Sequence, residues 1–108
     1  MIEINSILLE GVVIGETHLV KTSTTPVLNF TIENTRYYKF KTGEDVTETS
    51  QFRVVAFNSM FKRPLKEGSS VRVVGRLKQN KWTDSEGASH SEVQIMAEHI
   101  EIKKSKEA

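Results

Sequence analysis

The chain has 108 residues with a formal net charge of +1, and its 37% hydrophobic and 27% charged residues are typical of one small globular domain. Cysteine is absent, which excludes disulfides, thiolate metal sites and cysteine nucleophiles. No apolar run approaches the roughly 20 residues needed to cross a bilayer, and the first residues lack the pattern of a signal peptide, so we expect a cytoplasmic protein.

The first predicted element is a strand at residues 4–14. Its odd-numbered residues from Ile7 to Val13 are apolar or glycine and share one face. Gly11 inside this run suggests a bulge or a bend. The polar residues 21–26 then predict a loop.

Apolar and polar residues alternate at 27–33, which predicts a second, half-buried strand. Residues 36–48 read as the end of a strand running into a loop, and residues 49–57 as the third strand. Only residues 59–68 could hold a helix, with Met60 and Phe61 on its inward face. Pro64 keeps that helix short, because proline lacks a backbone donor and disfavours helix in the residue before it.

A fourth strand is predicted at 71–82, a turn at 84–87 and a fifth strand at 92–102. Five strands with one short helix between the third and fourth predict an all-β fold, a five-stranded, partly open barrel of the OB type. An immunoglobulin-like sandwich would need seven strands. We expect residues 1–103 to form this domain and residues 104–108 to be a disordered tail.

Positive charge is concentrated in residues 52–82. This segment holds eight Lys or Arg residues and one acid, a net charge of +7, so that the rest of the chain carries −6. Three phenylalanines and the only tryptophan, Trp82, lie in the same segment. Cations attract phosphates and flat aromatic rings stack on bases, so this combination suits a nucleic acid.

Alternation assigns these side chains to faces. In the fourth strand the odd-numbered residues from Val71 to Leu77 are apolar or glycine, so the polar residues face outward. The outward set is Arg72, Arg76, Lys78 and Trp82. In the third strand Arg53 indicates that its own face, with Phe57, is outward, because burying an unpaired arginine is costly. The phenylalanines assigned to the core or to an interface are Phe30, Phe40 and Phe52.

Exposed aromatic rings beside cations favour a single-stranded ligand, because a duplex hides the faces of its bases. Few Asn or Gln residues lie among the cations, so reading of base edges is not expected. The alternative for Trp82 is a core position, since tryptophan is highly buried on average. RNA binding would use the same physics.

Four segments carry a family resemblance: NSILLEG at 5–11, FRVVAF at 52–57, LKEGSSVRVVGRL at 65–77 and KWTDSEG at 81–87. In this order and at this spacing they resemble the bacterial single-stranded-DNA-binding protein family, SSB, over residues 4–102. The resemblance implies an OB fold and non-enzymatic binding of single-stranded DNA in replication, recombination and repair. It also implies a homo-oligomer, with a homotetramer favoured over a dimer, and replication or repair proteins as further partners.

The resemblance implies that Trp82 and Phe57 occupy the positions of two base-stacking aromatic residues of the family. Tyr37 or Tyr38 lies near the position of a third such residue. Consecutive residues of a strand point to opposite faces, so at most one of the two tyrosines should face the ligand. A fourth family aromatic, an indole two residues before the strand arginine, is Gln51 here. The residues expected to bind nucleic acid are Trp82, Phe57, Tyr37, Tyr38, Arg53, Arg72, Arg76, Lys78, Lys81, Arg36 and Lys39.

The family normally continues into a long tail with an acidic tip, whereas this sequence stops at Lys-Ser-Lys-Glu-Ala. The chain is therefore either the binding core of a longer protein or a tailless paralogue that acts as a primosome interaction module with weak DNA binding. The three histidines are scattered without ligand spacing and only two aspartates occur. We expect no metal, no cofactor and no catalytic acid–base pair.

Overall fold

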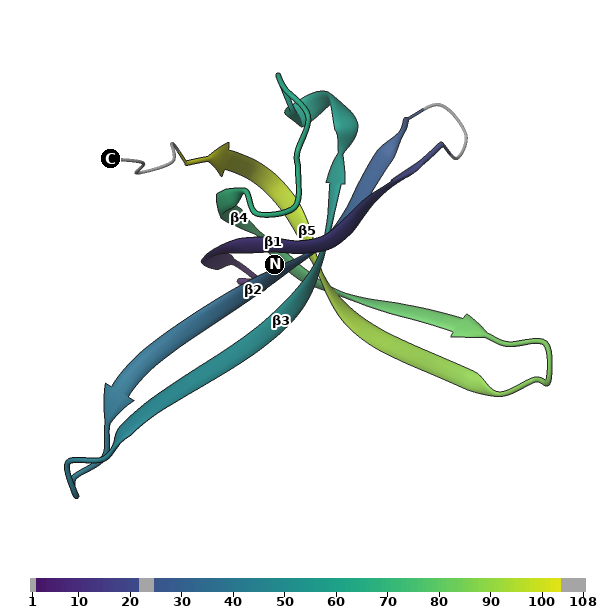
Figure 1. Ribbon diagram of the computed structural model, residues 1–108. Helices are drawn as coiled ribbons and strands as arrows, with labels where there is room; N and C mark the ends of the chain where they lie inside the picture. Colours follow the sequence, from purple (N-terminus) through teal and green to yellow (C-terminus); the bar gives the residue numbers. More distant parts are fainter. Residues whose placement is uncertain (1, 22–24, 104–108) are drawn as a thin grey trace.

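The computed structural model describes residues 2–21 and 25–103. Within these residues five strands form a closed barrel in the order β1-β2-β3-β5-β4 (Figure 1), which confirms the all-β, OB-type prediction. The strands are β1 (Ile7–Val20), β2 (Val27–Lys39), β3 (Asp45–Phe57), β4 (Ser70–Thr83) and β5 (Ser89–Ile102). The predicted tail at 104–108 and part of the predicted loop at 21–26 lie outside the described residues.

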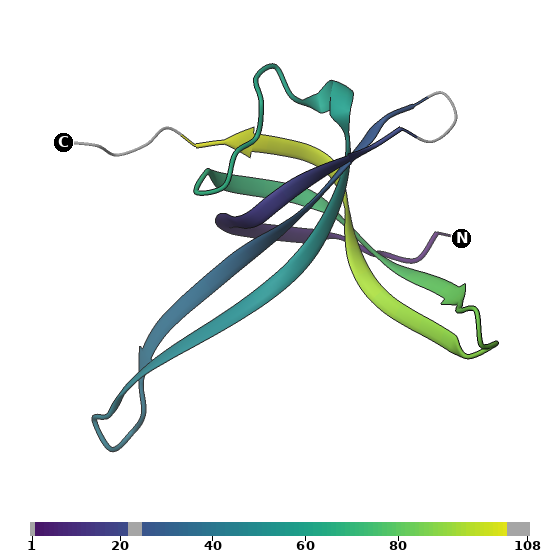
Figure 2. The same cartoon turned by 45° about the vertical axis from the view of Figure 1, so that its right-hand side comes forward.

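Two antiparallel hairpins extend well beyond the barrel (Figures 1 and 2). The β2–β3 hairpin pairs continuously from Val27 opposite Phe57 to Lys39 opposite Asp45. The predicted strand end and loop at 36–48 correspond to the end of β2 at residues 36–39 and the turn at 40–44, whereas residues 45–48 belong to β3 and were wrongly placed outside a strand. The β4–β5 hairpin ends at the predicted turn, 84–87.

Strand β1 begins at Ile7, three residues later than predicted, and continues to Val20. Just before it, the side-chain amide of Asn5 donates to the carbonyl of Leu77 at 2.8 Å and accepts from the amide of the same residue at 2.9 Å. The side chain of Asn5 thus makes the pair of hydrogen bonds to Leu77 that the backbone of a strand residue would otherwise make, and it holds the N-terminal segment against β4.

The predicted helix at 59–68 is absent. Within the described part of the chain, the segment between β3 and β4 contains only a 3₁₀ turn, η1 (Asn58–Met60), without a side-chain cap. Pro64 explains the short length, because it disfavours the helical geometry of the residue before it. Met60 and Phe61 do pack against the core as predicted, and Leu65 is buried in it. Across residues 2–21 and 25–103 no helix is long and apolar enough to span a membrane.

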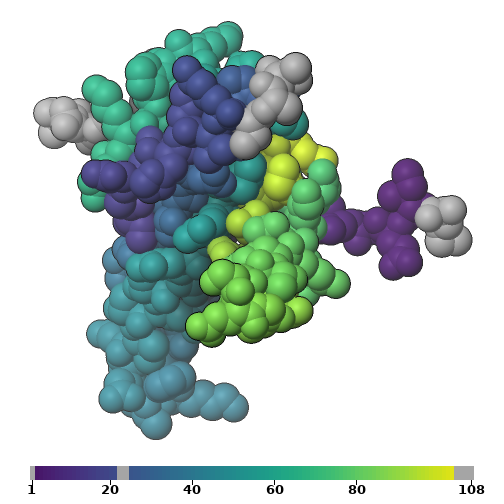
Figure 3. All heavy atoms as spheres, turned by 90° about the vertical axis from the view of Figure 1, so that its right-hand side faces the viewer, coloured from purple at the N-terminus to yellow at the C-terminus, as the bar shows by residue number. Residues whose placement is uncertain are grey.

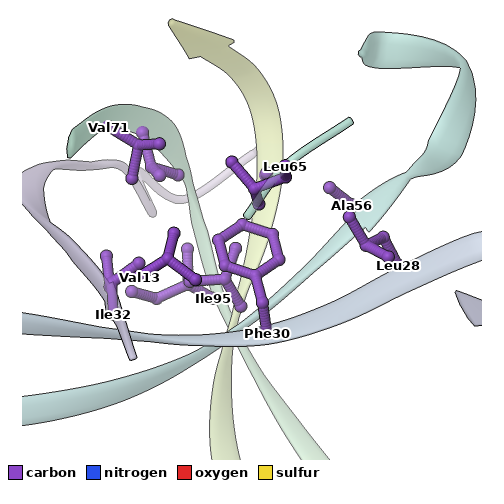
Figure 4. Close-up of a cluster of buried hydrophobic side chains, with 11 residues drawn as sticks. Val13, Leu28, Phe30, Ile32, Ala56, Leu65, Val71 and Ile95 are labelled. Atoms are coloured by element: carbon purple, nitrogen blue, oxygen red, sulfur yellow. The ribbon is translucent and has the colours of Figure 1, made fainter. Parts of the chain in front are cut away.

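The core lies inside the barrel and is built from the inward faces that alternation predicts (Figure 4). Its largest fully buried side chains are Val13, Ile32, Val54, Val71 and Val73. Phe30 is buried among them, as predicted. Phe52 faces inward but is 39% exposed, because the β2–β3 hairpin leaves the barrel there, and Phe40 at the hairpin turn is 50% exposed. Phe40 is therefore not a core residue and Phe52 is only partly buried, while the alternative prediction of an interface position stays a prediction for both.

Two glycines allow the strands to approach closely enough to close the barrel. Gly11 lies where β1 changes partner from β4 to β2, and a Cβ there would lie 2.5 Å from the carbonyl oxygen of Glu33. The bulge in β1 itself occurs further on, between Ile14 and His18. Gly75 lies at the bulge in the β4–β5 pairing, where a Cβ would collide with a main-chain carbonyl of β5.

Candidate nucleic-acid interface

The outward faces of β3, β5 and β4 form one continuous surface. Val55 of β3 lies beside Met96 in the parallel β3–β5 pair, and Arg76 of β4 lies opposite Met96 in the antiparallel β4–β5 pair. Arg53 and Glu92 join β3 to β5 by an ion pair with an Nε–Oε1 distance of 3.3 Å. The outward residues predicted separately for the third and fourth strands therefore meet on one surface, which we call the ligand face.

Trp82 and Phe57 lie at different ends of the ligand face, and each is 44% exposed. Trp82 is near the tip of the β4–β5 hairpin, whereas Phe57 is the last residue of β3. The space-filling view in Figure 3 shows the β4–β5 hairpin, in light green, and the β2–β3 hairpin as two protruding lobes. Neither ring is a core residue, so both can be reached by a flat ligand.

The two tyrosines point to opposite faces of the β2–β3 hairpin, as their parity predicts. Tyr37, opposite Thr47, is on the face that continues from Arg53 and is 79% exposed. Tyr38 packs edge-on against Phe40, with ring centroids 5.8 Å apart. Of the two, Tyr37 is the one that is open to a ligand on the face of Arg53.

Several of the predicted cations are already paired with carboxylates. Lys39 lies 3.0 Å from Asp45, and Arg76 lies 4.0 Å from Glu98. These groups are exposed, so the pairs contribute little stability and a phosphate could replace the carboxylate. Within residues 2–21 and 25–103, neither Lys78 nor Lys81 has a carboxylate within ion-pair distance.

Arg72 belongs to a different cluster at the opposite end of β4 from Trp82. Its Nη2 and Nε atoms each lie 2.7 Å from one carboxylate oxygen of Glu10, and Lys103 lies 3.6 Å from the same oxygen. The hydrogen bond from Arg72, followed by the charge of Lys103, holds the pKa of the Glu10 carboxyl below its usual value. The structure thus separates Arg72 from the other outward cations of β4.

Gln51 and Glu33 face each other across the β2–β3 pair, on the outward face. The Gln51 amide donates to the Glu33 carboxylate at 3.4 Å. An amide and a carboxylate therefore stand where the family resemblance predicts an indole.

Arg36, on the same face as Tyr38, lies opposite Glu48.

His90 is the residue of this region that the sequence analysis did not select. It lies opposite Trp82 in the β4–β5 hairpin, and the two rings are stacked with centroids 5.4 Å apart and planes at 19°. Its Nε2 atom is 2.7 Å from an oxygen of Asp84. The three histidines have no metal-ligand spacing, and the sequence signal that identifies His90 is instead its register with Trp82 across the 84–87 turn.

A comparison with protein families matches residues 4–103 to the single-strand binding protein family. The chain belongs to this family. A single-stranded DNA-binding protein of Aquifex aeolicus is 39% identical over 83 residues, which are 74% of this chain and 56% of that protein. Single-stranded DNA-binding protein 1 of Xylella fastidiosa is 33% identical over 82 residues, 72% of this chain and 60% of that protein. The chain thus spans somewhat more than half the length of these curated relatives.

Solved structures of the single-strand binding family share the barrel. The small single-stranded DNA-binding protein from Streptomyces coelicolor has a TM-score of 0.70 at 26% identity, covering 95% of this chain and 96% of that one. An SSB of Plasmodium falciparum in complex with single-stranded DNA has a TM-score of 0.83 over 96% of this chain and 98% of that one. At 19% identity the second likeness supports the fold, and both agree with the closed five-stranded barrel.

Proposed function

We propose that this domain binds single-stranded DNA on the ligand face, without enzymatic activity and with little sequence preference. The observation that carries the proposal is the exposed ring of Trp82 on the same face of β4 as Arg76 and Lys78. Stacking of a base on an aromatic ring contributes about 1–3 kcal/mol and tolerates any base. Cations beside the ring neutralise phosphates and release counterions. In the cell, such a protein would protect exposed strands during DNA replication, recombination and repair.

Phe57 and Tyr37 would extend the stacking surface along β3 and β2. Arg53 lies on the face that these two rings share, so a strand passing from one ring to the other would meet a cation on its way. The pairing of Arg53 with Glu92 lowers the charge available to the strand until a phosphate replaces the carboxylate. We therefore expect Lys78, which lies on the ligand face, to contribute more to the salt dependence of binding than the paired arginines do. Lys81, although predicted to bind nucleic acid, alternates onto the opposite face of the β4–β5 hairpin.

The test compares variants on and off the ligand face by titration with fluorescent oligo-dT. We expect Trp82→Ala to weaken binding by roughly 5- to 150-fold, which corresponds to one stacked base, and Arg76→Ala and Lys78→Ala to weaken it less. Lys62→Ala, which removes a cation from the segment after η1, is the matched control and should bind as wild type. If Trp82→Ala and Arg76→Ala both bind as wild type, this assignment of the site is wrong.

A second candidate is a paralogue that acts as a replication or primosome interaction module with weak DNA binding. Two observations favour it: Arg53 and Arg76 are each at ion-pair distance from a glutamate, and Gln51 stands in place of an aromatic ring. This candidate predicts micromolar or weaker affinity for oligo-dT at moderate salt and no preference for single strands over duplex.

We also propose that the protein is a homotetramer, cytoplasmic and associated with the nucleoid. Among the described residues, β1 from Ile7 to Gly11 pairs only with β4, which leaves its other edge open to a strand of a second copy. Leu8, opposite Val74 in the β1–β4 pair, is 70% exposed. Light scattering would test this, with Leu8→Lys expected to lower the mass of the particle.

A further inference from the structure

Asp84 fixes His90 at the end of the β4–β5 hairpin. One oxygen of the Asp84 carboxylate accepts hydrogen bonds from the amides of Glu86 and Ala88, both at 2.9 Å. The other oxygen lies 2.7 Å from Nε2 of His90. Because the carboxylate is anchored in the turn, the imidazole has a defined position rather than a free surface rotamer.

That position covers one face of the Trp82 ring. The planes of the two rings differ by only 19°, so the imidazole and the indole together form a two-ring platform. The side chain of His90 is 44% exposed, so the platform is open to a ligand. A base can therefore stack on the uncovered face of the indole or on the outer face of the imidazole, and in either case the bound strand passes the end of the hairpin that carries His90.

We propose that His90 is a further nucleic-acid-binding residue, and that its protonation strengthens the binding of single strands at this end of the ligand face. The inference rests on the proposed function. Imidazole is the side chain whose charge normally changes between about pH 5 and 8. With His90 neutral, the His90–Asp84 pair carries one negative charge beside the platform, and this charge repels phosphates.

Protonation of His90 brings the net charge of the pair to zero. The other charged groups at this end of the hairpin are Lys81, Glu86, and Glu92 with its partner Arg53. For a phosphate about 5 Å away in water, one unit of charge corresponds to about a fourfold change in affinity. The dependence of affinity on salt should also steepen, by up to about 0.7 in the slope of log K against log salt.

The experiment measures the affinity of the full chain for oligo-dT at pH 8 and pH 5.5, at constant ionic strength. Wild type should bind about four times more tightly at pH 5.5. His90→Phe keeps a ring on Trp82 but cannot be protonated, so its affinity should be nearly the same at both pH values. His99→Gln, also on β5, is the matched control and should keep the wild-type pH dependence.

A second readout uses the fact that Trp82 is the only tryptophan of the chain. Its fluorescence without DNA should change between pH 8 and 5.5 in wild type and not in His90→Phe, because protonation alters the ring stacked on it. Weak binding of wild type at both pH values would contradict the proposed function itself. Tight binding whose pH dependence is the same in wild type and His90→Phe would overturn only the role of His90. Tighter binding by His90→Ala than by wild type at both pH values would overturn it too, since the imidazole would then be blocking Trp82.

Discussion

The carboxylate of Asp84 closes the β4–β5 turn with one oxygen and holds His90 with the other. The hydrogen bond from His90, followed by those from the backbone amides, lowers the pKa of the Asp84 carboxyl below its ordinary value of 3.8. A pKa that is lower in the folded than in the unfolded chain means that the ionised carboxylate stabilises the fold. This stabilisation is present above the unfolded pKa and is lost as the pH falls through the folded pKa.

Asp84→Asn should therefore lower the melting temperature near neutral pH, and its difference from wild type should shrink as the pH falls from about 5 to about 2. Thermal unfolding followed by circular dichroism across this range measures the effect. The control is Glu86→Gln, which removes a carboxylate of the same turn. The Glu86 carboxylate accepts none of these hydrogen bonds, so the difference in melting temperature between this variant and wild type should not change with pH. A difference between wild type and Asp84→Asn that stays constant with pH would contradict the assignment.

At the residue level, alternation within a strand predicted which side chains face outward, and the structure agrees for Arg53, Phe57 and Trp82. Alternation cannot predict which residues meet across strands. The stack of His90 on Trp82 depends on the register of β4 with β5. The ion pair of Glu10 with Arg72 joins residues 62 positions apart, so the pattern of residues within one strand could not predict it either.

At the level of the strands, the sequence predicted their number and centres better than their ends. The outer part of the β2–β3 hairpin has no buried face, so its residues lack the alternation of apolar and polar side chains on which the prediction relied. The helix prediction for residues 59–68 failed for a related reason. Leu65 is held in the core by tertiary packing, and the segment around it needs no regular hydrogen bonding of its own.

Gly75 is the position at which the strands are most sensitive to an added side chain. A Cβ there would collide with the main-chain oxygen of Met96, which belongs to the paired strand and cannot rotate away. Gly75→Ala should lower the free energy of unfolding by about 1–3 kcal/mol, the usual cost of overpacking. Urea unfolding would measure this loss. The control is Thr83→Ala at an exposed position of the same strand, and its free energy of unfolding should be within about 0.5 kcal/mol of wild type. Equal stability of the two variants would show that the barrel relaxes around the added methyl group.

For the whole molecule, the net charge of +1 is the sum of +7 in residues 52–82 and −6 in the rest of the chain. Folding brings some of the acids next to the cations of residues 52–82, so the two charges are less separated in space than in the sequence. Of the cations of residues 52–82, Arg53, Arg72 and Arg76 are within ion-pair distance of glutamates from other strands or from the bulge in β5. The sequence therefore predicted the barrel and its basic outward face. It overestimated the charge of that face, because it could not predict which acids the closed barrel would bring there.

The most direct test of the central claim is the affinity of the wild-type chain for oligo-dT and for a duplex of equal length across a salt series. If the ligand face binds single strands, the chain should prefer the single strand clearly, and binding should quench the fluorescence of Trp82. The value of log K should also fall linearly with log salt, by about 0.7 for each phosphate neutralised. Micromolar or weaker affinity at moderate salt, equal for the two ligands and without a change in Trp82 fluorescence, would contradict the claim.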